Sequence, residues 1–124
     1  MSGPSRDAIV TGLRRAGARF AFVHGSRATG TARPDSDLDV AAWWPGAAPA
    51  PWDLSLPDGV DLLVLNGAPL ELAGRVALHG ELLFDDDPPA RVAWQAQTRL
   101  VYLDEEDRQR ALDRIFFEER AGGR

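Results

Sequence analysis

Hydrophobic side chains recur along this chain with two spacings, and these spacings predict alternating helices and strands. Between residues 7 and 18, the apolar positions Ile9, Val10, Leu13 and Ala16 follow the period of one helix face. Four short apolar runs are predicted to be strands, at residues 19–24, 38–44, 59–65 and 81–84. Two further helices are predicted, at residues 68–78 and 89–121. The pattern therefore indicates an α/β (α+β) fold, with a small mixed sheet flanked by helices.

The length of the chain indicates one domain. With 124 residues and no internal repeat, residues 1–124 are expected to share one fold, with its core at about 7–84 and a C-terminal helical segment at about 89–121. The segment 45–57 holds four prolines and is predicted to be a connecting loop. The connections between strands leave open whether each pair is parallel or antiparallel.

The C-terminal segment is expected to lie on the sheet as a helix that bends or restarts at Asp104. Seven apolar side chains are predicted to pack there: Val92, Ala96, Leu100, Leu103, Leu112, Ile115 and Phe116. Tyr102 and Phe117 are expected to form an exposed patch for a partner.

Three smaller motifs have plain structural interpretations. Three tryptophans, Trp43 and Trp44 at a strand end and Trp52 in the proline-rich loop, either pack in the core and loop or stack on a nucleotide base, and packing is favoured. Residues 85–87 are three aspartates and are interpreted as a solvated turn. His24 is interpreted as a strand-end residue, with no site shared with His79.

The stretch from His24 to Val40 contains the chemistry of the chain. Gly25 allows the backbone to approach a ligand closely, and Ser26 offers a hydroxyl and free N–H groups to a phosphate. Because strand side chains alternate, Asp37 and Asp39 point to the same face. Paired carboxylates on rigid backbone suit a hard divalent cation such as Mg²⁺.

A third carboxylate, Asp61, interrupts a later apolar strand, where aspartate is otherwise a poor choice. With Asp37 and Asp39 it would complete a two-metal site. The competing interpretations are weaker. A solvated turn explains Asp-x-Asp alone, a calcium loop lacks its glycine and glutamate, and a Walker A loop lacks its lysine.

Composition narrows the function further. All 14 basic residues are arginines, so Schiff-base and P-loop lysine chemistry is excluded and guanidinium groups such as those of Arg27 and Arg33 are the candidate cationic phosphate ligands. A net charge of −5 argues against general nucleic-acid binding. The sequence has no cysteine, no signal-peptide pattern and no apolar run of membrane-spanning length. A soluble protein of the cytoplasm is expected.

The motif resembles that of the nucleotidyltransferase superfamily of the DNA polymerase beta type, in which Gly-Ser is followed by ten residues and Asp-x-Asp. Here Gly25-Ser26 is followed by residues 27–36 and then by Asp37-Leu38-Asp39. The short length and the whole run from His24 to Val40 are similar to the minimal nucleotidyltransferases. Weaker likeness continues through residues 60–66, 68–70 and 79–84.

The resemblance implies transfer of a nucleoside monophosphate, AMP from ATP, with release of pyrophosphate. It implies that Asp37, Asp39 and Asp61 ligate Mg²⁺ and are catalytic. It also implies that Gly25 and Ser26 hold the triphosphate, and Arg33 matches a basic position of the family; Arg27 is a further candidate for phosphate binding.

Many minimal nucleotidyltransferases are antitoxins encoded beside a HEPN-domain toxin. The resemblance therefore implies a protein adenylyltransferase whose acceptor is a hydroxyl of a HEPN toxin. Two alternatives stay open. One is a nucleotidyltransferase for a small hydroxylated compound such as an antibiotic, and the other is a non-enzymatic antitoxin that neutralises its partner by binding.

Overall fold

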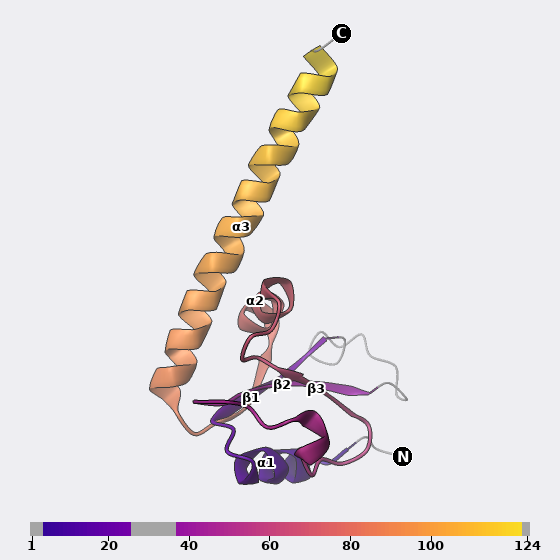
Figure 1. The fold of residues 1–124 in the computed structure, drawn as a ribbon, viewed down its shortest axis with the longest axis vertical. Helices are drawn as coiled ribbons and strands as arrows, with labels where there is room; N and C mark the ends of the chain where they lie inside the picture. Colours follow the sequence, from indigo (N-terminus) through magenta and orange to yellow (C-terminus); the bar gives the residue numbers. More distant parts are fainter. Residues whose placement is uncertain (1–3, 26–36, 123–124) are drawn as a thin grey trace.

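The fold is a four-stranded mixed sheet with helices on both faces (Figure 1). The computed structural model describes residues 4–25 and 37–122. In chain order the elements are α1 (Arg6–Arg15), β1 (Phe20–His24), β2 (Leu38–Trp43), the short 3₁₀ helix η2 (Pro51–Asp53), β3 (Val60–Val64), α2 (Leu70–His79), β4 (Glu81–Asp85) and α3 (Pro88–Gly122). The α/β class and the mixed sheet predicted from the sequence are confirmed.

The sheet has the strand order β3-β2-β1-β4. β1 is antiparallel to both of its neighbours, β2 and β4, whereas β2 and β3 are parallel. The connection from β2 to β3 has to return the chain to the starting edge, and the proline-rich segment with η2 spans that distance. This parallel pair sets Asp39 directly beside Asp61.

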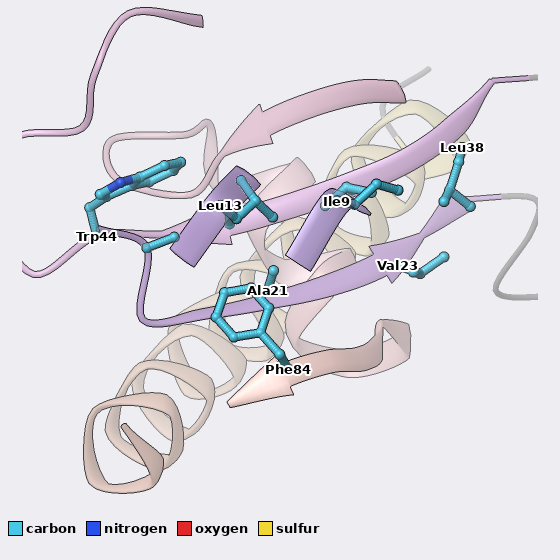
Figure 2. Packing of buried hydrophobic residues seen from close by; sticks show 10 residues of the cluster. Ile9, Leu13, Ala21, Val23, Leu38, Trp44 and Phe84 are labelled. Atoms are coloured by element: carbon cyan, nitrogen blue, oxygen red, sulfur yellow. The ribbon is translucent and has the colours of Figure 1, made fainter. Parts of the chain in front are cut away.

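One face of the sheet is covered by α1. Ser5 caps this helix by accepting a hydrogen bond from the Ala8 N–H at 3.4 Å. Figure 2 shows Ile9 and Leu13 of α1 lying over the strands, and both side chains are fully buried. Burial of each such side chain contributes about 1.5–3 kcal/mol, so α1 is anchored by its predicted apolar stripe. Trp44 closes one end of this core and donates its indole N–H to the Ala16 carbonyl at 3.1 Å.

The opposite face is covered by α2 and the beginning of α3 (Figure 1). Phe20 and Phe22 of β1 are buried there with Val76 of α2, and Trp94 of α3 packs beside them. Trp43 stacks on Phe20 with a centroid distance of 5.0 Å. Together with the burial of Trp44, this contact confirms the packing interpretation for the two adjacent tryptophans. For Trp52 that interpretation is wrong, because its side chain in η2 is 85% exposed.

α3 is one helix of 35 residues, so the predicted bend or restart at Asp104 is wrong. At a rise of about 1.5 Å per residue it is about 50 Å long, and its second half extends away from the rest of the molecule (Figure 1). No helix within the described residues combines the length and the apolar character that a membrane crossing requires.

The packing predicted for the C-terminal helix is also wrong. The helix contacts the body through a stripe of half-buried residues, Ala90, Trp94, Thr98 and Tyr102, which recur every four positions. The seven apolar residues predicted to pack on the sheet (Val92, Ala96, Leu100, Leu103, Leu112, Ile115 and Phe116) are all exposed. α3 therefore has two stripes with helical period, and the less apolar stripe is the one that packs against α2 and the sheet.

The exposed patch predicted for Tyr102 and Phe117 is only partly correct. Tyr102 is half-buried against Gly74 of α2 and does not form an exposed patch. Phe117, the other member of the predicted patch, is exposed as expected, at 72%. In α2 the apolar side chain of Leu72 is 43% exposed, whereas the smaller side chains of Ala73 and Ala77 are buried.

The three aspartates at 85–87 form ion pairs and hydrogen bonds with other elements, so the interpretation of this segment as a solvated turn is wrong. Asp85 pairs with Arg91 at 2.9 Å, and Asp86 accepts two hydrogen bonds from Arg14, each at 2.8 Å. Asp87 caps α3 by accepting a hydrogen bond from the Ala90 N–H at 3.2 Å. These contacts connect β4, α1 and the start of α3.

Candidate active site

The candidate site lies at the end of the sheet where β1 ends and where β2 and β3 begin. β1 ends at His24, β2 begins at Leu38 and β3 begins at Val60. The Leu38 N–H donates to the Gly59 carbonyl at 2.8 Å, which aligns the first residues of the two parallel strands. Three strand ends therefore bring together residues that are far apart in the sequence.

Asp39 and Asp61 are register partners on the neighbouring strands β2 and β3. Partners in register point to the same face of a sheet, so the two carboxylates lie side by side. Asp39 is half-buried and Asp61 is exposed. Within the described part of the chain neither carboxylate takes part in an ion pair, and two like charges held together in this way favour a bound cation.

Asp37 precedes β2 by one residue and is exposed. It is two positions before Asp39, so the alternation of an extended chain directs both side chains to the same side. This placement agrees with the predicted carboxylate pair. No group of three or more acidic or histidine side chains in residues 4–25 and 37–122 is close enough to hold a metal ion by itself. A cation at this site would need further ligands, and the phosphate oxygens of a nucleotide are ligands of the right kind.

Gly25 follows β1 with a φ of +73°. A β-carbon at this position would overlap the carboxylate of Asp39, with the Asp39 Cγ atom only 3.2 Å away. Glycine is therefore required twice, for the left-handed backbone and for the close approach of the chain to the carboxylate. The close approach expected of Gly25 is thus seen toward a protein carboxylate, and its predicted contact with a phosphate stays a prediction. Ser26, Arg27 and Arg33 lie outside the described residues.

His24 belongs to the site although sequence reasoning gave it no role there. It is the register partner of Asp39 on β1, so the imidazole and the carboxylate share a face. Burial lowers the pKa of His24, while the charges of Asp39 and Asp61 act in the opposite direction. The result is a neutral imidazole near neutral pH. The signal in the sequence was its position directly before Gly25, at the end of the strand that pairs with the Asp-x-Asp strand.

The residues present fit a divalent cation and a nucleotide. The donor set consists of carboxylate oxygens, which Mg²⁺ prefers, and at least two of the carboxylates are adjacent. Gly25 has no β-carbon, and its backbone therefore lies directly against the Asp39 carboxylate. The register partners Asp39 and Asp61 are the adjacent candidates to hold the metal, and Asp37, before β2, is a further candidate ligand.

Comparison with known families supports the same chemistry. The family model described as "Polymerase beta, Nucleotidyltransferase" matches residues 9–89, which include the three aspartates, β1 to β4 and α2. No curated protein matches the chain.

Solved structures with the same fold come from toxin–antitoxin complexes. A chain of a toxin–antitoxin structure with AMP-PNP is 24% identical, with a TM-score of 0.73 over 90% of this chain and 98% of that one. A chain of the MntA–HepT complex is 21% identical, with a TM-score of 0.66 over 90% and 96%. A structure of tri-AMPylated Shewanella oneidensis HEPN toxin with MNT antitoxin contains a chain that is 20% identical, with a TM-score of 0.67 over 90% and 95%.

Proposed function

Because this chain belongs to the polymerase beta nucleotidyltransferase family, we propose that it transfers AMP from ATP to a hydroxyl group of a partner protein. The observation that carries the proposal is the register of Asp39 with Asp61, next to Gly25, whose backbone lies too close to the Asp39 carboxylate for any side chain. Adjacent carboxylates of this kind suit a divalent cation, and the cation would in turn bind the phosphates of a nucleotide. The activity would depend on Mg²⁺ and release pyrophosphate.

The proposed reaction is an in-line displacement at the α-phosphorus of ATP. The acceptor oxygen forms a new bond to this phosphorus, and the bond to the bridging oxygen of pyrophosphate breaks. Asp61 takes the proton of the acceptor hydroxyl, because it is the exposed carboxylate of the pair and lies at the edge of the sheet. Asp37 and Asp39 would hold the Mg²⁺. When bound, Mg²⁺ would neutralise phosphate charge and favour the ionised acceptor.

The partner that we propose is a HEPN-domain toxin, with this chain as its antitoxin. Support comes from the fold, which is shared with chains of toxin–antitoxin complexes along 90% of the sequence. One of those structures contains an AMPylated HEPN toxin together with an MNT antitoxin, which is the product of the reaction proposed here.

One observation favours a second function, that of an antitoxin that acts by binding alone. The second half of α3 exposes apolar side chains, including Leu112 and Ile115 at 53% and 52% and Phe117 at 72%. A surface of this kind suits a protein contact whether or not AMP is transferred.

The test is a transfer assay with the purified protein, its neighbouring gene product and ATP labelled at the α-phosphate. We expect Mg²⁺-dependent labelling of the partner, detected on a gel, with AMP addition confirmed by mass spectrometry. Asp39→Asn is expected to abolish the labelling. The matched control is Asp53→Asn, which changes an exposed carboxylate of η2, beside α1 on the other face of the sheet. Labelling of a small hydroxylated compound and not of the partner would contradict the protein acceptor.

A further inference from the structure

One nitrogen of the His24 imidazole makes no contribution to the hydrogen bonding of the described fold. This Nε2 atom is buried and has no hydrogen-bond partner in the part of the chain that the structure describes. An unpaired buried nitrogen costs about 1–3 kcal/mol, and such atoms are rare in natural proteins unless they have a function. A phenylalanine or leucine would fill the same space at the end of β1 without this cost.

The position of His24 identifies the acceptor that its nitrogen can reach. Its register partner is Asp39, and side chains of such partners have β-carbons about 4.5–5.5 Å apart. Asp61 lies one strand further away, and each strand adds about 4.8 Å. The carboxylate of Asp39 is therefore the adjacent acceptor. In the described structure it lies against Gly25 and takes part in no ion pair.

We propose that His24 is a positioning residue, which donates its Nε2–H to the Asp39 carboxylate when that carboxylate ligates the Mg²⁺ of a bound nucleotide. A carboxylate has enough lone pairs to bind a cation and accept this hydrogen bond at once. Hydrogen bonds of this kind fix the orientation of metal ligands and strengthen metal binding. The inference rests on the proposed function and specifies how its metal ligand is held.

The test compares two replacements of His24. His24→Phe fills the space but has no donor, whereas His24→Gln places an amide N–H near the position of Nε2. The full chain is titrated calorimetrically with Mg²⁺ and an ATP analogue that carries a methylene group between the α- and β-phosphates. We expect His24→Phe to bind the pair about 10–100-fold more weakly and His24→Gln to retain most of the affinity. Without ligand, His24→Phe is expected to unfold at the same or a higher temperature, because the unpaired nitrogen is gone.

A matched control is His79→Gln, which changes the exposed histidine at the end of α2. The sequence has 2 histidines, so this variant also assigns the imidazole signals in a nitrogen-detected NMR spectrum. The Nε2–H proton of His24 is expected to move downfield when Mg²⁺ and the analogue are added together, and to stay in place when the analogue is added with a chelator.

Three results would overturn the inference. His24→Phe could bind the metal–nucleotide pair as tightly as the parent protein, His24→Gln could be as weak as His24→Phe, or the Nε2 atom could carry no proton in the complex. These results leave the proposed function intact if Asp39→Asn still abolishes binding. If the parent protein binds no metal–nucleotide pair at all, the proposed function fails and this inference fails with it.

Discussion

The backbone of Gly25 lies so close to the carboxylate of Asp39 that no β-carbon fits between them. Gly25 directly follows β1, and Asp39 is the second residue of the neighbouring strand β2. The end of β1 therefore contacts the Asp39 side chain of the neighbouring strand β2, the residue proposed as a metal ligand. Under the proposed function, nucleotide and metal binding would be coupled through this contact, since a shift of the backbone at Gly25 would move the carboxylate.

The first prediction uses this contact. Gly25→Ala should lower the free energy of unfolding by about 1–2 kcal/mol through its left-handed backbone and should also displace Asp39. We expect the calorimetric titration with Mg²⁺ and nucleotide to show no binding. The matched control is Gly67→Ala, since Gly67 has a φ of +76° but no atom within 4 Å of an added β-carbon. The control should lose the same stability and keep its affinity. Equal affinity in both variants would contradict the role of the contact.

The second prediction concerns Gly74 and Tyr102, which join α2 to α3. A β-carbon on Gly74 would overlap the ring of Tyr102, with the Tyr102 Cβ atom 2.8 Å away. Glycine to alanine inside a helix normally stabilises by about 1 kcal/mol, whereas overpacking costs about 1–3 kcal/mol. Gly74→Ala should therefore lower the free energy of unfolding.

A double-mutant cycle checks the cause. In a Tyr102→Ala background the ring is absent, so the same glycine replacement should become stabilising, as its helix propensity alone requires. Urea unfolding of the four proteins measures both effects. If Gly74→Ala is stabilising in the presence of Tyr102, the two helices are not packed in the way described.

The fold could be predicted from the sequence wherever one spacing pointed to one face. Ile9 and Leu13 were placed correctly because α1 has a single apolar stripe, and every predicted strand formed for a similar reason. α3 shows the limit of this reasoning. Leu100 and Leu103 form a stripe with helical period, yet the helix meets the body through Trp94 and Tyr102. Periodicity identifies a helix but does not say which of two stripes finds a partner.

The site was partly readable for a related reason. Asp37 and Asp39 were paired by strand alternation, and the structure adds the parallel register that brings Asp61 beside Asp39. The relative direction and the register of β2 and β3 depend on how the two strands pair in the sheet. The spacing of apolar residues along the sequence does not determine this pairing. His24 could not be assigned to the site from the sequence. Its place there depends on its cross-strand register with Asp39 and on the absence of a hydrogen-bond partner for its Nε2 atom in the described residues.

The third prediction concerns acid stability. Arg14 holds the pKa of Asp86 below its usual range, mainly through the hydrogen bonds between them. A carboxyl whose pKa is lower in the folded state stabilises the fold above its unfolded pKa, and this contribution is lost as the pH falls through the folded value. Asp86→Asn should therefore be less stable than the parent at pH 7, and the difference should shrink below about pH 4.

Urea unfolding at a series of pH values measures this difference. Both side chains are exposed, at 51% for Arg14 and 36% for Asp86, so added salt should weaken the effect at every pH. Glu71→Gln is the comparison, because it removes an exposed ion pair within one helix that no other element shares. A difference between Asp86→Asn and the parent that grows toward low pH would contradict the assignment.

The last prediction separates transfer from binding, and Asp61 is the residue that distinguishes them. Asp61→Asn should keep metal-bound nucleotide, because Asp37 and Asp39 still supply ligands, but it loses the group that accepts the proton of the acceptor hydroxyl. A loss of about 10²–10⁴-fold in the rate of AMP transfer is expected. Cells that express the partner toxin should then stop growing although the two proteins still bind each other.

An antitoxin that acts by occlusion gives the opposite pattern. Its activity would depend on the exposed side chains of α3, such as Phe117 and Leu112, and not on a carboxylate at the end of the sheet. Phe117→Ala with Leu112→Ala should then abolish protection, while Asp61→Asn protects as well as the parent protein. Growth assays with both variants, combined with mass spectrometry of the partner, decide between the two functions. Full protection by Asp61→Asn with no AMP on the partner would exclude transfer as the source of protection, because the residue that accepts the proton would then be dispensable.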